Sequence, residues 1–178
     1  RCCNHLFCRA EYLIRYFNIF IKVMVHKIIT HIEGLEKAKS YCAYQERCHK
    51  EVSDKLYSWK LNADEIDYII DNLLQENYLN EERFAITFAG GKFRIKKWGR
   101  KKIIQKLKEK GVSDYCIKKG LEEIIEEEYI SNMRNLIEKK YTSLKDKNIF
   151  TKKKKTAAYL YGKGYESDLI WTHLNDCY

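Results

Sequence analysis

One apolar spacing occurs three times in the chain and restricts its fold more than any single residue does. Each copy contains four apolar residues separated by five, five and four positions. The copies are Leu56, Leu61, Ile66 and Ile70; Leu107, Val112, Ile117 and Leu121; and Leu160, Tyr165, Ile170 and Leu174. A recurring apolar pattern indicates a supersecondary unit that buries its apolar face against neighbouring units. The spacing therefore predicts an all-α fold, a tandem array of three three-helix repeats that is elongated and curved.

The composition is that of a helical protein with a substantial core. The chain has 178 residues, of which none is proline and only eight are glycine. Proline removes a backbone hydrogen-bond donor and stops helices. Loop-rich β folds usually contain both proline and glycine, so their scarcity here favours helices. Hydrophobic residues make up 45% of the chain, which argues against a wholly disordered protein. The patterning predicts a lead-in over residues 24–35 and repeats over 36–79, 80–126 and 127–178.

Local signals mark the ends of the expected helices. Three residues that favour the N-cap position stand where helices are expected to begin, and these are Asn62, Asn80 and Ser113. Glu65 follows the first of them by three positions, which predicts a capping box. In the second and third copies a glycine stands between the first and second apolar positions. We expect turns at Gly111, Gly162 and Gly164. In the first copy the corresponding residue is Lys60.

The first 23 residues differ from the rest of the chain. The stretch from Leu6 to Val25 is apolar and aromatic, but four charged residues interrupt it: Arg9, Glu11, Arg15 and Lys22. Charges are unfavourable at bilayer depth, so this stretch is not expected to span a membrane. Ordinary patterning begins at Met24, and we interpret residues 1–23 as an upstream translation extension or a disordered lead. The alternative, an additional amphipathic helix packed on the array, stays open.

The seven cysteines form no C-x-x-C pair. Cys42 and Cys48 are too widely spaced for a usual zinc knuckle. His49 follows Cys48, which leaves a metal site conceivable, but reduced structural cysteines are the favoured interpretation. We therefore expect no metal and a reducing, cytoplasmic location.

Basic residues exceed acidic residues by 34 to 25, which indicates a polyanionic partner, nucleic acid first. The density is highest between Lys92 and Lys110. On a helical wheel Ile103, Ile104 and Leu107 share one side, and lysines cover most of the other. The candidate contacts to nucleic acid or filament are Lys92, Arg94, Lys96, Lys97, Arg100, Lys101, Lys102, Lys106 and Lys108. The alternative is a merely solvated lysine face, with Trp98 serving as packing.

No catalytic pattern is present in the sequence. G-x-S-x-G, H-E-x-x-H and a Walker loop are all absent, and the five histidines are dispersed. An enzyme is the least favoured class, and no cofactor is expected.

An ordered series of residues resembles the central signature of the RecX family of bacterial recombination regulators. The series is Arg83-Phe84-Ala85, Phe88, Gly91-Lys92, Trp98-Gly99, Lys102-Ile103, Leu107 and Gly111-Val112. We take Arg83, Phe84, Trp98, Gly99, Leu107 and Gly111 as the family-signature residues. Flanking segments in the first and third repeats are also similar, so that the resemblance covers about Glu36 to Asn175.

The resemblance implies a fold, a partner and a role. Members of this family are tandem three-helix repeats that bind the RecA recombinase filament on single-stranded DNA and lie in its groove. They restrain its activities in recombination, DNA repair and the SOS response, and they have no known catalysis. We therefore expect a cytoplasmic monomer that binds the RecA filament and single-stranded or duplex DNA, without a membrane.

Two alternatives remain at this point. Besides the filament regulator that the resemblance implies, the chain could be a stand-alone basic helical-repeat protein that binds nucleic acid without a recombinase or, less favoured, an enzyme of unknown kind.

Overall fold

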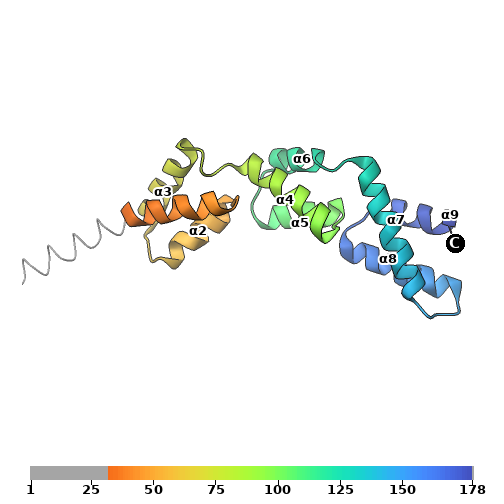
Figure 1. Cartoon of the computed structure of the whole chain (residues 1–178). Coiled ribbons are helices and arrows are strands. Elements are labelled where there is room, and N and C mark those ends of the chain that lie inside the picture. The colour runs from red at the N-terminus through yellow and green to blue at the C-terminus, as the bar shows by residue number, and fades with distance from the viewer. Residues whose placement is uncertain (1–31, 178) are drawn as a thin grey trace, which may run out of the picture. The chain divides into compact units, whose positions relative to one another are not determined.

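The computed structural model describes residues 32–177, and these are helical throughout apart from short connections, without a strand (Figure 1). This confirms the all-α prediction. The expectations for residues 1–23 and for most of the lead-in lie outside the described residues. In chain order the helices are one over 32–44, α2 (His49–Ser58), α3 (Ala63–Gln75), α4 (Glu81–Lys96), α5 (Arg100–Glu109), α6 (Asp114–Glu122), α7 (Glu126–Ser143), α8 (Ile149–Lys163) and α9 (Ser167–Cys177).

The described chain divides into two compact units, the first made of residues 32–45 and 52–78. Its buried side chains come from all three of its helices and include Ala38, Leu56 and Leu73. Asn62 caps α3 as expected. Its side-chain oxygen accepts from the Glu65 amide at 3.0 Å, and the Glu65 carboxylate accepts from the Asn62 amide at 2.9 Å. The predicted capping box is therefore confirmed.

The second unit contains residues 46–51 and 79–177 and is built on one core. Helices α4, α5 and α6 form one three-helix set, and α7, α8 and α9 form another. Phe93, Tyr129 and Tyr165 are among the largest fully buried side chains. The ring centroid of Tyr129 lies 6.0 Å from that of Phe93 and 5.0 Å from that of Tyr165. These aromatic contacts join the two sets, because Phe93 belongs to α4 and the tyrosines to the following set.

The repeated apolar spacing marks the core. All four residues of the third copy are buried, as are the first three of each earlier copy, while Ile70 and Leu121 are half-buried. The breaks between the first and second apolar positions are turns with positive φ: Lys60 at 62°, Gly111 at 75° and Gly164 at 90°. Lysine thus adopts in the first repeat the left-handed conformation that glycine provides in the other two.

Two local expectations were wrong. Gly162 lies inside α8, which continues to Lys163 and ends at Gly164 as its C-cap, so the chain turns once rather than twice. The sequence pattern also places Ile95 on one side of α4 with Phe84, Phe88 and Gly91, but Ile95 is 77% exposed. The buried face of that helix passes through Ala85, Ala89 and Phe93, and a residue two positions after Phe93 is rotated by about 200° from it.

Cys42, Cys48 and Cys116 are free and buried, whereas Cys177 is free and exposed. Burial raises the pKa of the Cys48 and Cys116 thiols, which keeps them protonated. Within residues 32–177 no group of histidine, cysteine and acidic side chains is arranged to hold a metal ion. Over the same range, no helix has the length and apolar character required to cross a bilayer.

Candidate nucleic-acid interface

The N-terminus of α5 is held by the third repeat. Gly99 is its N-cap, and no side chain caps the helix there. Instead the amide of Gly99 donates to the Lys163 carbonyl at 2.8 Å, and the amide of Lys101 donates to the Gly164 carbonyl at 3.1 Å. The first amides of a helix lack partners within it, and the last carbonyls of another helix lack donors. The end of α8 and the start of α5 therefore satisfy each other.

This contact requires glycine on both sides. A Cβ atom on Gly99 would lie 2.3 Å from the carbonyl carbon and oxygen of Gly164. A Cβ atom on Gly164 would lie 2.3 Å from the Cβ atom of Lys102, and its φ of +90° is itself unfavourable for other residues. The role of Gly99, one of the family-signature residues, is thus close backbone packing between repeats.

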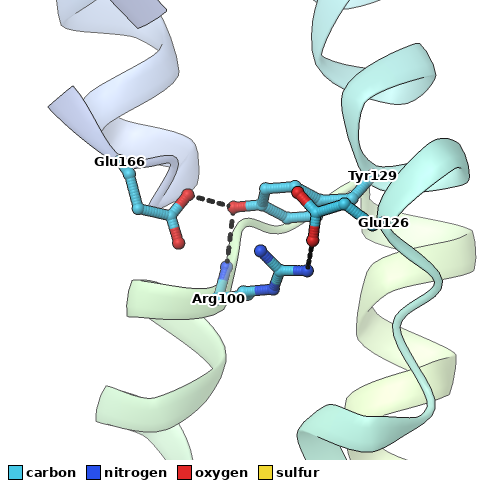
Figure 2. Close-up of polar contacts among 4 residues, drawn as sticks. All are labelled: Arg100, Glu126, Tyr129 and Glu166. Carbon is cyan, nitrogen blue, oxygen red and sulfur yellow. Dashed lines mark hydrogen bonds and ion pairs between the residues drawn. The ribbon is translucent and has the colours of Figure 1, made fainter. Parts of the chain in front are cut away.

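A hydrogen-bonded network also connects the start of α5 with residues of α7 and with Glu166 (Figure 2). The Tyr129 hydroxyl donates to the Glu166 carboxylate at 2.5 Å and accepts from the Arg100 amide at 3.2 Å. The guanidinium of Arg100 donates to Glu126 at 2.5 Å and lies 4.2 Å from the centre of the Tyr129 ring. Three amides at the beginning of α5, those of residues 99–101, are therefore all satisfied by the third repeat.

The electrostatics of the network fix its protonation. Burial and the hydrogen bond to Glu166 raise the pKa of Tyr129, so its hydroxyl remains a donor throughout the physiological range. Burial also raises the pKa of Tyr165 to about 12, with a contribution from the charge of Glu166. Burial alone would lower the pKa of Arg100, but its hydrogen bond with Glu126 and the charge of that carboxylate raise it.

Five lysines lie on the segments that meet where the end of α8 contacts the start of α5. We call this group the basic junction, and its members are Lys96, Lys97, Lys101, Lys102 and Lys163. The Lys163 ammonium donates to the Lys96 carbonyl at 3.2 Å, and the Lys102 ammonium donates to the Gly162 carbonyl at 2.7 Å. Among the described residues, no carboxylate forms an ion pair with any of the five. Lys96 and Lys101 are exposed. Their positive charge is therefore available to an external anion.

Other members of the predicted basic set are paired internally. Arg100 pairs with Glu126 at 2.5 Å, Lys106 with Glu109 at 2.6 Å and Lys108 with Asp114 at 3.1 Å. Arg94 lies 4.0 Å from Glu123. A paired cation contributes less to the external potential than an unpaired one. Of the nine sequence candidates, four thus belong to the basic junction (Lys96, Lys97, Lys101 and Lys102), four have carboxylate partners (Arg94, Arg100, Lys106 and Lys108), and Lys92 lies beside the rings of Phe88 and Trp98.

Trp98 is half-buried and packed against the core of the second unit. The ammonium groups of Lys92 and Lys102 lie 5.7 and 5.0 Å from its ring. This arrangement agrees with the packing interpretation of Trp98. The remaining signature residues also serve the fold. Phe84 and Leu107 are buried, Arg83 pairs with Glu46 at 2.6 Å, and Gly111 has positive φ.

Lys163 was not among the residues expected at the site, because no pattern in the sequence distinguishes it from other lysines. Lys140 and Lys163 place their ammonium groups 5.6 and 5.7 Å from the ring of Tyr159, and all three lie in the third repeat. Lys163 stands 61 positions after Lys102 in the sequence. Contacts between the end of α8 and the start of α5, among them the hydrogen bond from the Gly99 amide to the Lys163 carbonyl, bring it to the basic junction. The available local signal was the glycine after it, which matches Gly111 in the second repeat.

Comparison with known proteins assigns the family. Residues 80–121 match the model of the second three-helix domain of RecX, and residues 126–174 match the model of the third. Together the two matches cover just over half of the chain. The chain belongs to the RecX family. The matched stretches correspond to α4–α6 and to α7–α9, the two sets joined at the basic junction.

Relatives in the RecX family support this assignment. The regulatory proteins RecX of Bacillus cereus strain AH820 and Bacillus anthracis strain A0248 are 32% identical over 134 residues, or 75% of this chain. The chain spans about half the length of these relatives, with 50% covered. RecX from Lactobacillus salivarius has a solved structure that superposes with a TM-score of 0.74 at 26% identity, over 84% of this chain and 97% of that one. A second structure, of a regulatory protein RecX, has the same fold, with a TM-score of 0.76 at 17% identity over 86% of this chain and 77% of that one.

Proposed function

We propose that this protein binds the RecA–single-stranded DNA filament in the cytoplasm and restrains its recombinase activity by binding rather than by catalysis. The observation that carries the proposal is the basic junction in a chain of the RecX family. Its five lysines lack carboxylate partners among the described residues and stand on backbone segments joined by hydrogen bonds.

The physical basis is recognition of phosphate groups by a preorganised surface. Lysines that contact phosphates release condensed counterions, so their contribution to affinity falls as salt concentration rises. The backbone hydrogen bonds between residues 99–101 and 163–164 fix the relative position of the backbone segments that carry these lysines before binding. A surface that is already ordered loses less conformational entropy on association. The same lysines are also suited to acidic protein surfaces along the filament.

The decisive experiment combines the full chain with RecA, single-stranded DNA and ATP. We expect strand exchange, ATP turnover and repressor cleavage by RecA to decrease as the protein is added. If all three remain unchanged at saturating protein, the regulatory proposal is wrong.

A pair of triple variants tests the role of the basic junction. Replacing Lys96, Lys97 and Lys101 with glutamine should weaken binding to single-stranded DNA and lower the slope of log affinity against log salt. The expected decrease is about 0.7 for each phosphate that the variant no longer neutralises. The matched control replaces three lysines that are paired with carboxylates, Lys106, Lys108 and Lys119, and removes the same formal charge. Equal decreases in both variants would show that net charge alone, and not the junction, determines binding.

The second candidate is a nucleic-acid-binding protein that needs no recombinase. The cationic surface favours this candidate equally, because phosphates of free DNA offer the same charge as phosphates within a filament. Binding to free single-stranded and duplex DNA, together with an unchanged RecA reaction, would select it.

A further inference from the structure

A second basic surface lies on the third repeat, next to the basic junction. Residues 139–163 form the last turn of α7, the connection after it and α8. They contain nine lysines and a single acidic residue, Asp146. This segment therefore has a formal charge of +8, against +9 for the whole chain. A segment with such an excess of positive charge attracts a polyanion.

Part of this charge lies along one face of α8. Residues three or four positions apart share a face of a helix, and one such series in α8 is Lys152, Lys155, Tyr159 and Lys163. We call it the α8 row. At 1.5 Å per residue, the row is about 16 Å long. Its last member, Lys163, belongs to the basic junction, so the row extends that surface along the third repeat.

Tyr159 is the aromatic member of the α8 row and is 36% exposed. The ammonium of Lys140, on the adjacent α7, lies 5.6 Å from the centre of its ring, and that of Lys163 lies 5.7 Å from it (Figure 1). Throughout residues 32–177, no carboxylate forms an ion pair with either lysine. Two lysines without carboxylate partners thus lie beside a ring that solvent reaches.

Two explanations are available for an exposed ring between two lysines. In the first, the lysines only cover the ring; in the second, the ring is a platform for a base, and the lysines bind the phosphates beside that base. Proteins that bind single strands combine a positively charged surface with aromatic rings on which bases stack. A stacked base contributes about 5- to 150-fold in affinity, whereas an exposed cation–π contact contributes about two- to fivefold. The stronger interaction wins, so a base displaces an ammonium from the ring.

We propose that single-stranded nucleic acid follows the α8 row from the basic junction, with one base stacked on Tyr159 and the adjoining phosphates bound by Lys140 and Lys163. Charge complementarity and continuity with the basic junction favour this occupant over an apolar or cationic one. The bases of a duplex are already stacked on one another, so Tyr159 favours single strands over duplexes. The inference deepens the proposed function, since it rests on nucleic acid lying at the basic junction, but it does not require the recombinase.

The first test measures the affinity of the full chain for a fluorescein-labelled oligo-dT and for an abasic strand of the same length, by fluorescence anisotropy. Tyr159→Ala should bind oligo-dT about fivefold or more weakly than wild type, because one stacked base is lost. It should bind the abasic strand and duplex DNA like wild type, since neither presents an unpaired base to the ring. Tyr159→Phe keeps the ring and should bind oligo-dT like wild type.

Tyr115→Ala is the matched control, because Tyr115 is an exposed tyrosine, at 63%, on α6, which carries neither of the lysines beside Tyr159. Its affinity for both strands should equal that of wild type. The proposal is refuted if the Tyr159→Ala and Tyr115→Ala variants bind oligo-dT equally well, or if the wild-type chain does not bind oligo-dT at low salt. Equal losses by Tyr159→Ala for oligo-dT and the abasic strand would also refute it, because Tyr159 would then only position the lysines.

Lys140→Gln separates the phosphate contact from the stacked base. It should weaken binding to oligo-dT and to the abasic strand alike, and lower the slope of log affinity against log salt by about 0.7 for the lost phosphate. Tyr159→Ala removes no charge and should keep the wild-type slope. Lys119→Gln is the control, because Lys119 pairs with Glu122 at 3.1 Å. Equal decreases in slope for the two lysine variants would contradict a phosphate contact at Lys140.

These titrations contain no RecA, so they decide the inference separately from the proposed function. If the wild-type chain leaves RecA activity unchanged while Tyr159→Ala loses affinity for oligo-dT alone, the regulatory proposal fails and the stacking site is supported. If the wild-type chain inhibits RecA while Tyr159→Ala binds oligo-dT as wild type does, the stacking site is refuted and the regulatory proposal is supported.

Discussion

Gly99→Ala is the substitution that tests most directly how the second and third repeats are joined. Its added Cβ atom would lie 2.3 Å from both the carbonyl carbon and the oxygen of Gly164 and 2.5 Å from the Tyr165 amide nitrogen. All three atoms are backbone, so no side chain can rotate away, and α5 must separate from the end of α8. The φ of Gly99 is −77°, which alanine adopts readily, so the expected effect is steric and not conformational.

The magnitude follows from two contributions. Forcing additional volume into a closely packed site costs about 1–3 kcal/mol. Separation also weakens the hydrogen bonds from Gly99 to Lys163, at 2.8 Å, and from Lys101 to Gly164, at 3.1 Å. Each contributes about 0.5–1.5 kcal/mol. We therefore expect the free energy of unfolding to fall by about 2–6 kcal/mol, a large fraction of the stability of a small domain.

The assay is equilibrium urea unfolding followed by circular dichroism and tryptophan fluorescence. Gly91→Ala is the control, because a Cβ atom on Gly91 meets no atom within 4 Å and the residue lies inside α4. Alanine at a helical position should stabilise the protein by up to about 1 kcal/mol. If Gly99→Ala unfolds at the same urea concentration as wild type, the close contact between Gly99 and Gly164 does not stabilise the fold.

Three further substitutions test single features by the same unfolding measurement. Tyr129→Phe removes a fully buried hydroxyl and leaves Glu166 and the Arg100 amide without that partner, so we expect a loss of about 1–3 kcal/mol; a loss no greater than that of Tyr115→Phe at an exposed site would contradict this. Lys60→Gly relieves a positive φ of 62° and should raise stability by up to about 1 kcal/mol, whereas a decrease would show that the lysine side chain stabilises the turn. Asn62→Ala removes the N-cap of α3 and should lower stability by about 0.5–2 kcal/mol, and an unchanged midpoint would mean that the capping box contributes nothing.

Features that depend on neighbouring residues were predictable from the sequence. The apolar spacing indicated the helices and most of the core, because the period of a helix and the need to bury one face determine where apolar residues stand. The caps at Asn62, Asn80 and Ser113 were predictable for the same reason, since each accepts from an amide three positions later. The turn expected at Gly162 was wrong, because glycine is compatible with the last turn of a helix as well as with the position that ends it.

The site depended on contacts between distant residues, which spacing alone does not give. On a helical wheel Lys106 and Lys108 appear as available as Lys101. Glu109, three positions after Lys106 on the same helix, is a partner that the sequence already offered, whereas the pairing of Lys108 with Asp114 across the turn at Gly111 depends on the fold. Lys163 belongs to the basic junction because two glycines 65 positions apart in sequence meet there. The sequence indicated the region of densest positive charge, and the structure distinguishes its paired lysines from its unpaired ones.

The way in which α5 is capped also determines how phosphates are bound at the junction. A helix N-terminus ordinarily offers free amides and a positive dipole end to an anion. Here the amides of Gly99, Arg100 and Lys101 already donate to Lys163, Tyr129 and Gly164. Under the proposed function, phosphate contacts at this point therefore come from lysine side chains and not from these three amides. Binding should then depend on salt through those side chains, as the pair of triple variants measures, and a phosphate contact that survives removal of the junction lysines would contradict this account.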